Sequence, residues 1–245
     1  MRILTLNTWQ ERGPWRERWE VTFRGMECFR PEIAAFQELF NPAWAQEVRK
    51  RTGYASLLFP EEPCGLAILT DFPVQSWGVA KLTKSPLEDY LRCALWAELR
   101  VRGERIVIIN THLPWMLEDG SSRRKQVEEI LELVKKKAPQ AGSILMGDLN
   151  APPDSSEIQW LIDRGPFRDL FRERHPNQSG FSWDNRNPYA GGSFHKMPDR
   201  RIDYILVRGK APFLQNLVSC DLVYTEPDAN GVWASDHYGL LAEFQ

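Results

Sequence analysis

Apolar and polar residues recur along the chain in short blocks that predict strands alternating with helices. Residues 2–7, "RILTLN", form a short β run, and residues 32–38, "EIAAFQE", are a candidate buried strand. Between them, four apolar side chains follow a helical spacing, namely Trp15, Trp19, Phe23 and Met26. This spacing predicts a helix over 15–29, and the Asn-Pro pair that opens segment 41–51 predicts the start of a second helix.

The middle of the chain has mainly β character, followed by helices. From 54 to 113 the apolar runs are short and separated by turns, with residues 103–106, "GERI", as a hairpin turn. Residues 121–137 place four apolar side chains on one face and end in lysines that suit a helix C-terminus. We then expect a strand at 143–147 and a helix near 155–163.

The last third begins with a loop-rich stretch, 175–200, and closes with three strands at 201–207, 217–224 and 238–244. No repeat, low-complexity segment or Gly/Ser linker interrupts the pattern, so residues 1–245 are expected to form a single domain. Short strands, many of them joined as hairpins, with a few helices among them indicate an α/β fold with mixed, mostly antiparallel sheets.

Composition narrows the class of protein. The chain is 42% hydrophobic and 26% charged, as in a soluble domain with a substantial core. Its 31 basic and 33 acidic side chains argue against a dedicated binder of duplex nucleic acid, although a locally basic cleft stays open. No run approaches the ~18 apolar residues of a membrane span. Four scattered cysteines read as reduced thiols, so we expect a cytoplasmic protein, and we also expect a monomer.

Polar residues of catalytic type recur where predicted strands end or begin. They are Asn7, Glu38, His112, Asp148, Asn150, Asp203, Asp236 and His237. Each alone is an ordinary turn former or structural histidine. Together they could hold a hard divalent cation, Mg²⁺ or Mn²⁺, and keep two imidazoles for proton transfer. No GxSxG, Walker, GxGxxG or HExxH motif is present, and phosphodiester hydrolysis is the chemistry that most needs such a set.

Seven stretches in family order span nearly the whole chain: "LTLNTW" (4–9), "AFQEL" (35–39), "GLAILTDFPV" (65–74), "NTHL" (110–113), "GDLNAPPDS" (147–155), "RRIDYILV" (200–207) and "SDHYGLLAEF" (235–244). With them the sequence resembles the endonuclease/exonuclease/phosphatase superfamily, which includes pancreatic-type deoxyribonucleases and neutral sphingomyelinases. The resemblance implies a four-layer αββα sandwich of two packed sheets with outer helices. It also implies an active site at one end of the sandwich.

The resemblance further implies roles for individual residues on the metal and water side. Glu38 would be the principal Mg²⁺ ligand, with Asn7 beside it and Asp236 also on the metal side. Asp148 would activate or orient the attacking water. Asn150 would hold the phosphate or Asp148 itself.

The same resemblance implies the roles of the imidazoles. His237 would be the catalytic imidazole, oriented by Asp203. His112 would donate to a phosphate oxygen in the transition state. Because every acid and histidine of the pattern is present, we expect a metal-dependent phosphodiesterase rather than a catalytically silent binding module of the same fold.

Marks of individual subfamilies are mostly missing. The chain has "DRRIDY" (199–204) where inositol polyphosphate 5-phosphatases carry Trp-Cys-Asp-Arg, and it lacks the Trp of abasic-site endonucleases there. Leu149 stands where tyrosyl-DNA phosphodiesterases tend to have Thr. What remains resembles a broad bacterial-type group, so the substrate stays open between nucleic acid and a small or lipid phosphoester, including a sphingomyelinase-like activity.

Substrate contacts are predicted from residues beside the motifs. Four tryptophans could stack on a base or line a lipid entrance, or could be structural: Trp9, Trp115, Trp183 and Trp233. From these we take Trp115 and Trp183, together with Arg92, as candidate substrate-binding residues. Three others, Trp77, Trp96 and Trp160, are expected in the core. Arg92 and Arg123 could each contact phosphate or could be solvated surface arginines.

Overall fold

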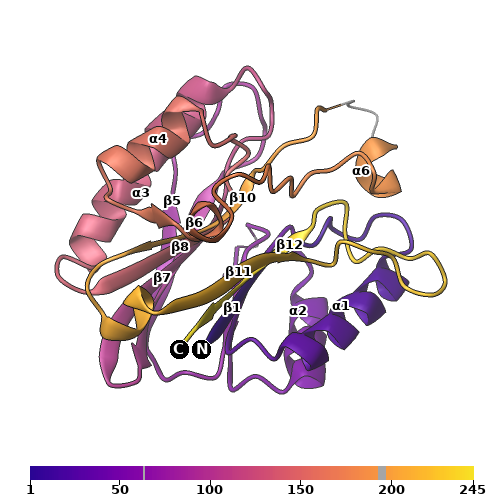
Figure 1. Cartoon of the computed structure of the whole chain (residues 1–245), viewed down its shortest axis with the longest axis horizontal. Helices are drawn as coiled ribbons and strands as arrows, with labels where there is room; N and C mark the ends of the chain where they lie inside the picture. The colour runs from indigo at the N-terminus through magenta and orange to yellow at the C-terminus, as the bar shows by residue number, and fades with distance from the viewer. Residues whose placement is uncertain (63, 193–196) are drawn as a thin grey trace.

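Two six-stranded sheets pack face to face in the computed structural model, which describes residues 1–62, 64–192 and 197–245 (Figure 1). The first sheet has the order β11 (Leu217–Val223), β12 (Gly239–Phe244), β1 (Arg2–Asn7), β2 (Ile33–Gln37), β4 (Ala67–Thr70) and β3 (Ser56–Leu58). The second has the order β5 (Val74–Lys81), β6 (Cys93–Val101), β7 (Glu104–His112), β8 (Gly142–Asp148), β10 (Asp203–Arg208) and β9 (Arg168–Asp169). Only β1–β2 and β7–β8 pair in parallel within the described ranges, so the predicted mixed, mostly antiparallel sheets are confirmed.

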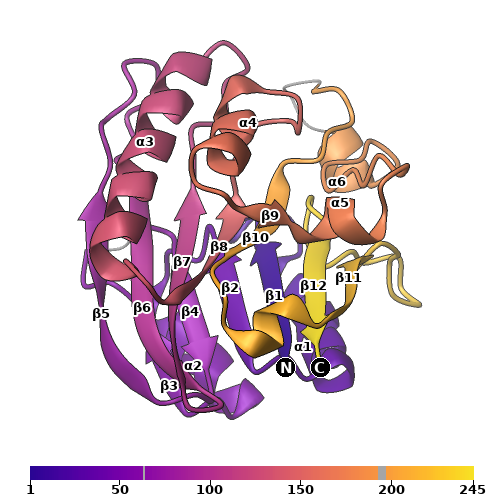
Figure 2. The same ribbon diagram turned by 60° about the vertical axis from the view of Figure 1, so that its left-hand side comes forward.

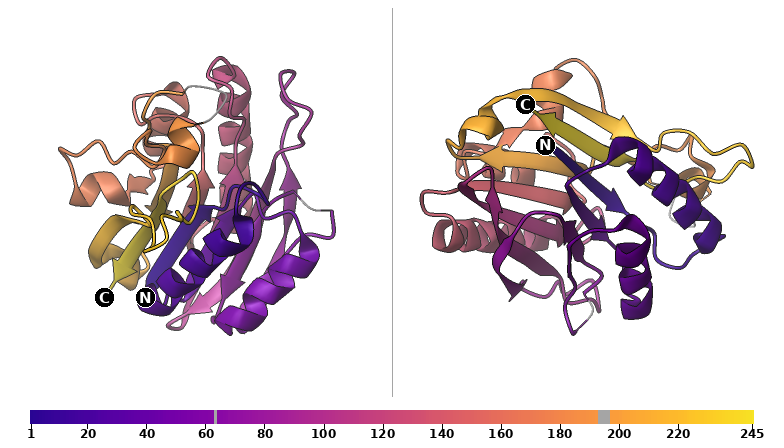
Figure 3. Two further views of the ribbon diagram at one scale, coloured as in Figure 1. Left: turned by 90° about the vertical axis from the view of Figure 1, so that its right-hand side faces the viewer. Right: turned by 90° about the horizontal axis from the view of Figure 1, so that it is seen from below.

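Helices cover the outer face of each sheet and complete four layers. Helices α1 (Trp15–Phe29) and α2 (Pro42–Thr52) lie together on the first sheet (Figure 3), and α3 (Gly120–Lys137) and α4 (Ser156–Asp163) lie on the second (Figure 2). One apolar core fills the space between the sheets, and one further core lies between each sheet and the helices on its outer face. The four-layer αββα sandwich predicted from the resemblance is therefore confirmed.

Local sequence explains where the helices start and stop. Asn41 caps α2, with its side-chain oxygen accepting the Trp44 N–H at 3.1 Å, and Gly53 ends the helix at φ +78°. Ser155 caps α4 by accepting the Ile158 N–H at 3.4 Å. The predicted helices agree with the observed ones to within one residue at each end.

Short elements escaped the sequence analysis. Strand β9 and helix α5 (Leu170–Arg174) were not predicted, because two to five residues carry no readable period. The loop-rich stretch 175–200 contains the single-turn helix α6 (Pro188–Gly191), and its residues 193–196 lie outside the described residues. A 3₁₀ turn, η1 (Pro212–Gln215), precedes β11.

The prediction that Trp77 is a core residue was wrong. Strand β5 is an edge strand, and the Trp77 side chain on it is 42% exposed. Trp96 and Trp160 are partly buried against the core under α3 and α4. All four cysteines are free thiols, and no helix of the described segments has both the length and the apolar character to cross a membrane.

Candidate active site

Strand direction brings the predicted polar residues to one edge of the sandwich. Parallel β1 and β2 end side by side, as do β7 and β8, so Asn7, Glu38, His112 and Asp148 share that edge. Strands β12 and β10 run antiparallel to these neighbours, so the residues at their beginnings arrive at the same edge. The register even places Asp148 directly between His112 on one side and Asp203 on the other.

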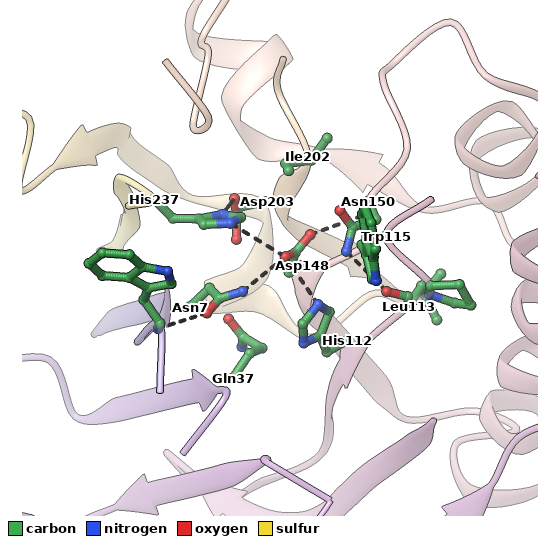
Figure 4. A network of polar contacts seen from close by, with 12 residues as sticks. Asn7, Gln37, His112, Leu113, Trp115, Asp148, Asn150, Ile202, Asp203 and His237 are labelled. Carbon is green, nitrogen blue, oxygen red and sulfur yellow. Dashed lines mark hydrogen bonds and ion pairs between the residues drawn. The ribbon is translucent and has the colours of Figure 1, made fainter. Parts of the chain in front are cut away.

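Asp148 lies at the centre of this edge (Figure 4). Its Oδ2 accepts a hydrogen bond from Asn7 Nδ2 at 3.0 Å and lies 3.4 Å from His112 Nε2 and 3.8 Å from His237 Nε2. Its Oδ1 accepts the backbone N–H of Asn150 at 3.0 Å. Residues from both sheets therefore converge on one buried carboxylate.

The residue before Asp148 explains how the strand can present it. Gly147 has φ +132°, and a Cβ there would lie 2.0 Å from the carbonyl oxygen of Thr111 on β7. Only glycine fits such a close approach of two parallel strands. Asn150, two residues beyond Asp148, has φ +49°, which turns its N–H back to the carboxylate and its side-chain amide to Leu113 O at 3.0 Å.

His237 is held between two carboxylates. Its Nδ1 is hydrogen-bonded to Asp203 Oδ2 at 2.8 Å, and the edge of the Trp183 indole packs near its ring, with centroids 5.2 Å apart. Burial lowers the pKa of His237, but Asp203 and Asp148 outweigh that effect and raise the pKa to about 10. His237 is therefore an imidazolium at neutral pH.

His112 is the opposite case. Burial lowers its pKa well below the usual value, and the nearby charges of Arg92 and His237 lower it further. His112 is therefore a neutral imidazole that faces Asp148 Oδ2. One carboxylate thus lies beside a charged and a neutral histidine, an arrangement in which the two imidazoles can take different roles.

The carboxylates on the side of the first sheet have fewer partners. Glu38, at φ +59° just past β2, has no hydrogen bond or ion pair with any described residue. Asp236 is buried and accepts one hydrogen bond, from Ser235 Oγ at 3.1 Å. Burial raises the pKa of Asp236 to about 7, with a contribution from the negative charge of Glu38.

Burial and the repulsion of Asp203 likewise raise the pKa of Asp148 to about 7. An added positive charge would stabilise all of these acids in their ionised forms. Asn7 Oδ1 accepts the Trp9 N–H and keeps a second lone pair. Together with the carboxylate oxygens of Glu38 and Asp236, it fits a hard cation that keeps several of its waters. The ligand atoms of Asp148, Asp203 and His237 also lie within 4.8 Å of one another. In that set, however, the imidazole Nδ1 is already engaged in a hydrogen bond.

A cavity of about 310 Å³ opens over this edge. All of the predicted site residues except Asp203 line it: Asn7, Glu38, Arg92, His112, Trp115, Asp148, Asn150, Trp183, Asp236 and His237. Asp203 lies behind His237 and reaches the cavity only through that ring. The structure thus brings the whole predicted set to one place.

Neither arginine weighed for phosphate contact is a solvated surface residue. Arg92 lines the cavity but is bound to Glu88 by two hydrogen bonds, at 2.8 and 3.1 Å, and Glu88 also accepts the Trp115 N–H at 2.8 Å. Arg123 is buried, pairs with Glu157 at 3.0 Å and donates to backbone carbonyls, so it contacts no substrate. The Arg92–Glu88 pair forms within one loop, and the Arg123–Glu157 pair joins α3 to α4, so the apolar periods of the sequence predict neither pair.

Three of the four tryptophans beside the motifs line the cavity and one does not. Trp9, Trp115 and Trp183 line it, whereas Trp233 is buried against Tyr238 outside it, with ring centroids 5.9 Å apart. Trp9 stacks on Tyr189 of α6 at 5.0 Å.

Sequence analysis missed one residue that shapes the rim. Arg18 of α1 is fully buried and its guanidinium donates to five backbone carbonyls, those of Thr8, Trp9, Gln10, Arg12 and Ala234, at 2.9–3.1 Å. It therefore holds loop 8–12, in which Trp9 and Gln10 both have positive φ. The sequence indicated this residue only by placing an arginine on the apolar face of the predicted helix.

Comparison with known proteins identifies the family. The model of the Endonuclease/Exonuclease/phosphatase family matches residues 16–237. This chain belongs to that family.

Relatives with names share the fold at low sequence identity. Tyrosyl-DNA phosphodiesterase 2 of Xenopus laevis is 23% identical over 236 residues, which cover 93% of this chain and 62% of the relative. The crystal structure of the D. rerio enzyme with single-strand DNA product superposes with a TM-score of 0.84 at 20% identity, covering 100% of this chain and 98% of that one. A Bacteroides vulgatus member of the family gives 0.78 at 17% identity, with 100% and 98% coverage.

Proposed function

We propose that this protein is a Mg²⁺-dependent phosphodiesterase, with Mn²⁺ as the alternative ion, that acts on short or single-stranded nucleic acid. The observation that carries the proposal is that Asp148 is surrounded by side chains that contact it, whereas Glu38 in the same cavity is not. Asn7, His112 and His237 all point at its Oδ2, while Glu38 lines the same cavity without a partner in the described part of the chain.

Asp148 is assigned to the attacking water. Its raised pKa suits a general base working near neutral pH, and Asn7 and the Asn150 N–H fix its orientation. A water bound at Oδ2 can give its proton to this carboxylate as its oxygen attacks phosphorus.

His237 and His112 are assigned to the phosphate and the leaving group. The His237 imidazolium, oriented by Asp203, can supply a proton to the departing oxygen or stabilise its negative charge. The neutral His112 can donate one N–H to a non-bridging oxygen. Each role uses the protonation state that the surroundings of that histidine favour.

Glu38, Asp236 and Asn7 are assigned to the metal. Bound there, a divalent cation would offset the charge of the phosphate and polarise its oxygens. Mg²⁺ typically uses one or two carboxylates together with water and substrate phosphate, which is the number of acids present on this side. The absence of cysteine from the cavity argues against a zinc site of the thiolate type.

Several features support nucleic acid as the substrate. The rim offers the indoles of Trp9, Trp115 and Trp183, and stacking on aromatic rings is a sequence-tolerant way to hold unpaired bases. The net charge of −2 disfavours long duplex. Similarity to an enzyme named tyrosyl-DNA phosphodiesterase 2 adds tyrosyl-DNA to the substrates that should be tested.

A small or lipid diester is the second candidate. Leu87, Tyr90 and Leu91 form an exposed apolar group, and Tyr90 also lines the cavity. An apolar substituent on the phosphate could pack there. The cytoplasmic location and the monomeric state stay predictions.

The experiment is a substrate panel assayed with Mg²⁺, with Mn²⁺ and with excess EDTA. It contains short single-stranded DNA, RNA, tyrosyl-DNA, sphingomyelin and bis(4-nitrophenyl) phosphate. We expect metal-dependent cleavage of the single-stranded nucleic acids, and a loss of about 10²–10⁴-fold in Asp148→Asn. The matched control is Asp163→Asn, which changes an exposed carboxylate on α4. Cleavage of sphingomyelin alone would replace the nucleic acid assignment, and full activity in EDTA would refute the metal mechanism.

A further inference from the structure

Two consecutive arginines lead into β10, and they are paired very differently. Arg201 is buried and forms a two-pronged ion pair with Asp169, at 3.0 and 2.7 Å. This pair ties β10 to the cap of α5 and is structural. Arg200 is also buried, with 7% of its surface exposed, but its Nε and Nη1 have no hydrogen-bond partner among the described residues.

The position of Arg200 is fixed by its backbone. Its N–H donates to Trp183 O at 2.8 Å and its carbonyl accepts the Trp183 N–H at 2.9 Å, which makes an isolated bridge between the two residues. Both residues line the cavity over Asp148. The guanidinium is thus held in the wall of the active site.

Burial without partners is costly for a charged group. Unsatisfied donors of a buried cation lose their hydration and gain nothing in return. Burial lowers the pKa of Arg200 accordingly, while the negative charges of Asp148 and Asp203 raise it. Asn7 and Asn150 engage the two oxygens of Asp148, and His237 engages Asp203 Oδ2, while Asp203 Oδ1 accepts no hydrogen bond from the described residues. Neither carboxylate accepts a hydrogen bond from Arg200, so the donors of its guanidinium stay unsatisfied within the cavity wall.

The other arginines at the cavity do not offer this. Arg92 is already neutralised by the two hydrogen bonds to Glu88, whose side chain is buried. Arg12 is exposed, so water satisfies its guanidinium. Among the described residues that line the cavity, Arg200 is the arginine that is both buried and unpartnered.

We propose that Arg200 is a phosphate-binding residue that donates hydrogen bonds to non-bridging oxygens of the scissile phosphate from the side of the second sheet. This inference rests on the proposed phosphodiesterase function and adds the residue that binds the anion opposite Glu38. The planar guanidinium presents adjacent N–H groups that match two oxygens of one phosphate, which a lysine ammonium cannot do. Because the backbones of Trp183 and Arg200 are hydrogen-bonded to each other, the phosphate contact of Arg200 and the aromatic contact of Trp183 would be positioned together.

The test compares Arg200→Met and Arg200→Lys with wild type and with Arg164→Met, which removes an exposed arginine far from the cavity. Binding of inorganic phosphate is measured by calorimetry, and its competitive inhibition constant by assay. Turnover is measured on bis(4-nitrophenyl) phosphate, which contains one phosphate only. We expect Arg200→Met to weaken phosphate binding by about 10- to 100-fold, the factor typical of hydrogen bonds to a charged group. We expect a loss of the same order in kcat/KM.

Arg200→Lys should retain part of the affinity through its charge but lose the two-pronged contact, and Arg164→Met should match wild type. Phosphate affinity that is unchanged in both Arg200 variants would overturn the inference, even if wild type is an active diesterase. A loss confined to substrates with a second phosphate would also overturn it, because Arg200 would then read a neighbouring group. A wild type that binds phosphate through Arg200 but cleaves no diester would refute the proposed function alone. If Arg200→Met fails to fold, Arg200→Lys and the inhibition constant decide the outcome.

Discussion

The cavity has two unlike halves. Around Asp148 on the second sheet, His112, Asp203 and His237, the last of which precedes β12 of the first sheet, are connected by contacts of 2.8 to 3.8 Å. In the other half, Glu38 has no partner among the described residues and Asp236 accepts a single hydrogen bond from its neighbour Ser235. Both halves are rich in acids, but the side chains around Asp148 are paired far more completely with one another.

The difference teaches which part of the chemistry is built into the chain. The imidazole half has fixed protonation states, because His237 is charged and His112 is neutral before any substrate arrives. The carboxylate half instead presents oxygens with few partners among the described residues, which a bound cation would fill.

The largest effect should come from removing the charged imidazole. His237→Ala should lower kcat by about 10²–10⁴-fold, the usual contribution of a positioned proton-transfer group. Because Glu38 and Asp236 are untouched, Mg²⁺ should still raise the melting temperature of the variant as it does that of wild type. Steady-state kinetics and thermal unfolding check both parts. Wild-type turnover would remove His237 from the mechanism.

A smaller effect is expected from Asp203→Asn, which keeps the shape but removes a charge that raises the pKa of His237. The folded pKa of about 10 lies above the unfolded value of about 6.5. The proton therefore stabilises the fold below pH 6.5, and this stability is lost as the pH rises through 10. In the variant, we expect the alkaline limb of the kcat profile to move to lower pH. Superimposable pH profiles would contradict the pairing.

The carboxylate half predicts a pH-dependent response to Mg²⁺. Asp236 and Asp148 have folded pKa values of about 7, above their usual 3.8. Without metal, these two carboxyl groups bind more protons in the folded protein than in the unfolded chain between about pH 4 and pH 7, so their contribution to stability falls as the pH rises through that range. A bound cation replaces those protons. Mg²⁺ should therefore raise the melting temperature more at pH 8 than at pH 5, and equal shifts would argue against a site among these acids.

The smallest effect concerns charge outside the cavity. Each duplex phosphate contact contributes a slope of about −0.9 in log affinity against log salt, and a chain with net charge −2 should make few such contacts. KM for a short single-stranded oligonucleotide should change little between low and physiological salt, and long duplex should bind no better. A steep slope confined to duplex would reveal a basic surface that the overall charge conceals.

The residues around Asp148 could be predicted from the sequence because they lie at the ends of strands. Asn7, His112 and Asp148 each close an apolar run, and antiparallel or parallel pairing then forces them together. The same logic predicts which residues share an edge of the sandwich, but not what they touch. That Asn150 would hold Asp148 through its backbone N–H depends on a positive φ that the letters do not show.

The rim could not be predicted in this way. The sequence leaves the roles of Arg92 and Arg123 open, and only the fold shows that Glu88 and Glu157 neutralise them. Arg200 and Arg201 are identical neighbours, yet Asp169 from an unpredicted two-residue strand pairs with one and not the other. Specific side-chain contacts in the fold decide these cases, and no apolar period in the sequence records them.

Metal binding to Glu38→Gln tests most directly the claim that a cation completes the carboxylate half. Glu104→Gln is the matched control, because it makes the same change at an exposed residue at the start of β7. Mg²⁺ affinity is measured by calorimetry and by the melting temperature, with no substrate present. We predict that Glu38→Gln loses most of the Mg²⁺ affinity and the thermal stabilisation, stays folded, and needs far more Mg²⁺ for activity, while Glu104→Gln matches wild type. Unchanged Mg²⁺ affinity in Glu38→Gln would contradict the account.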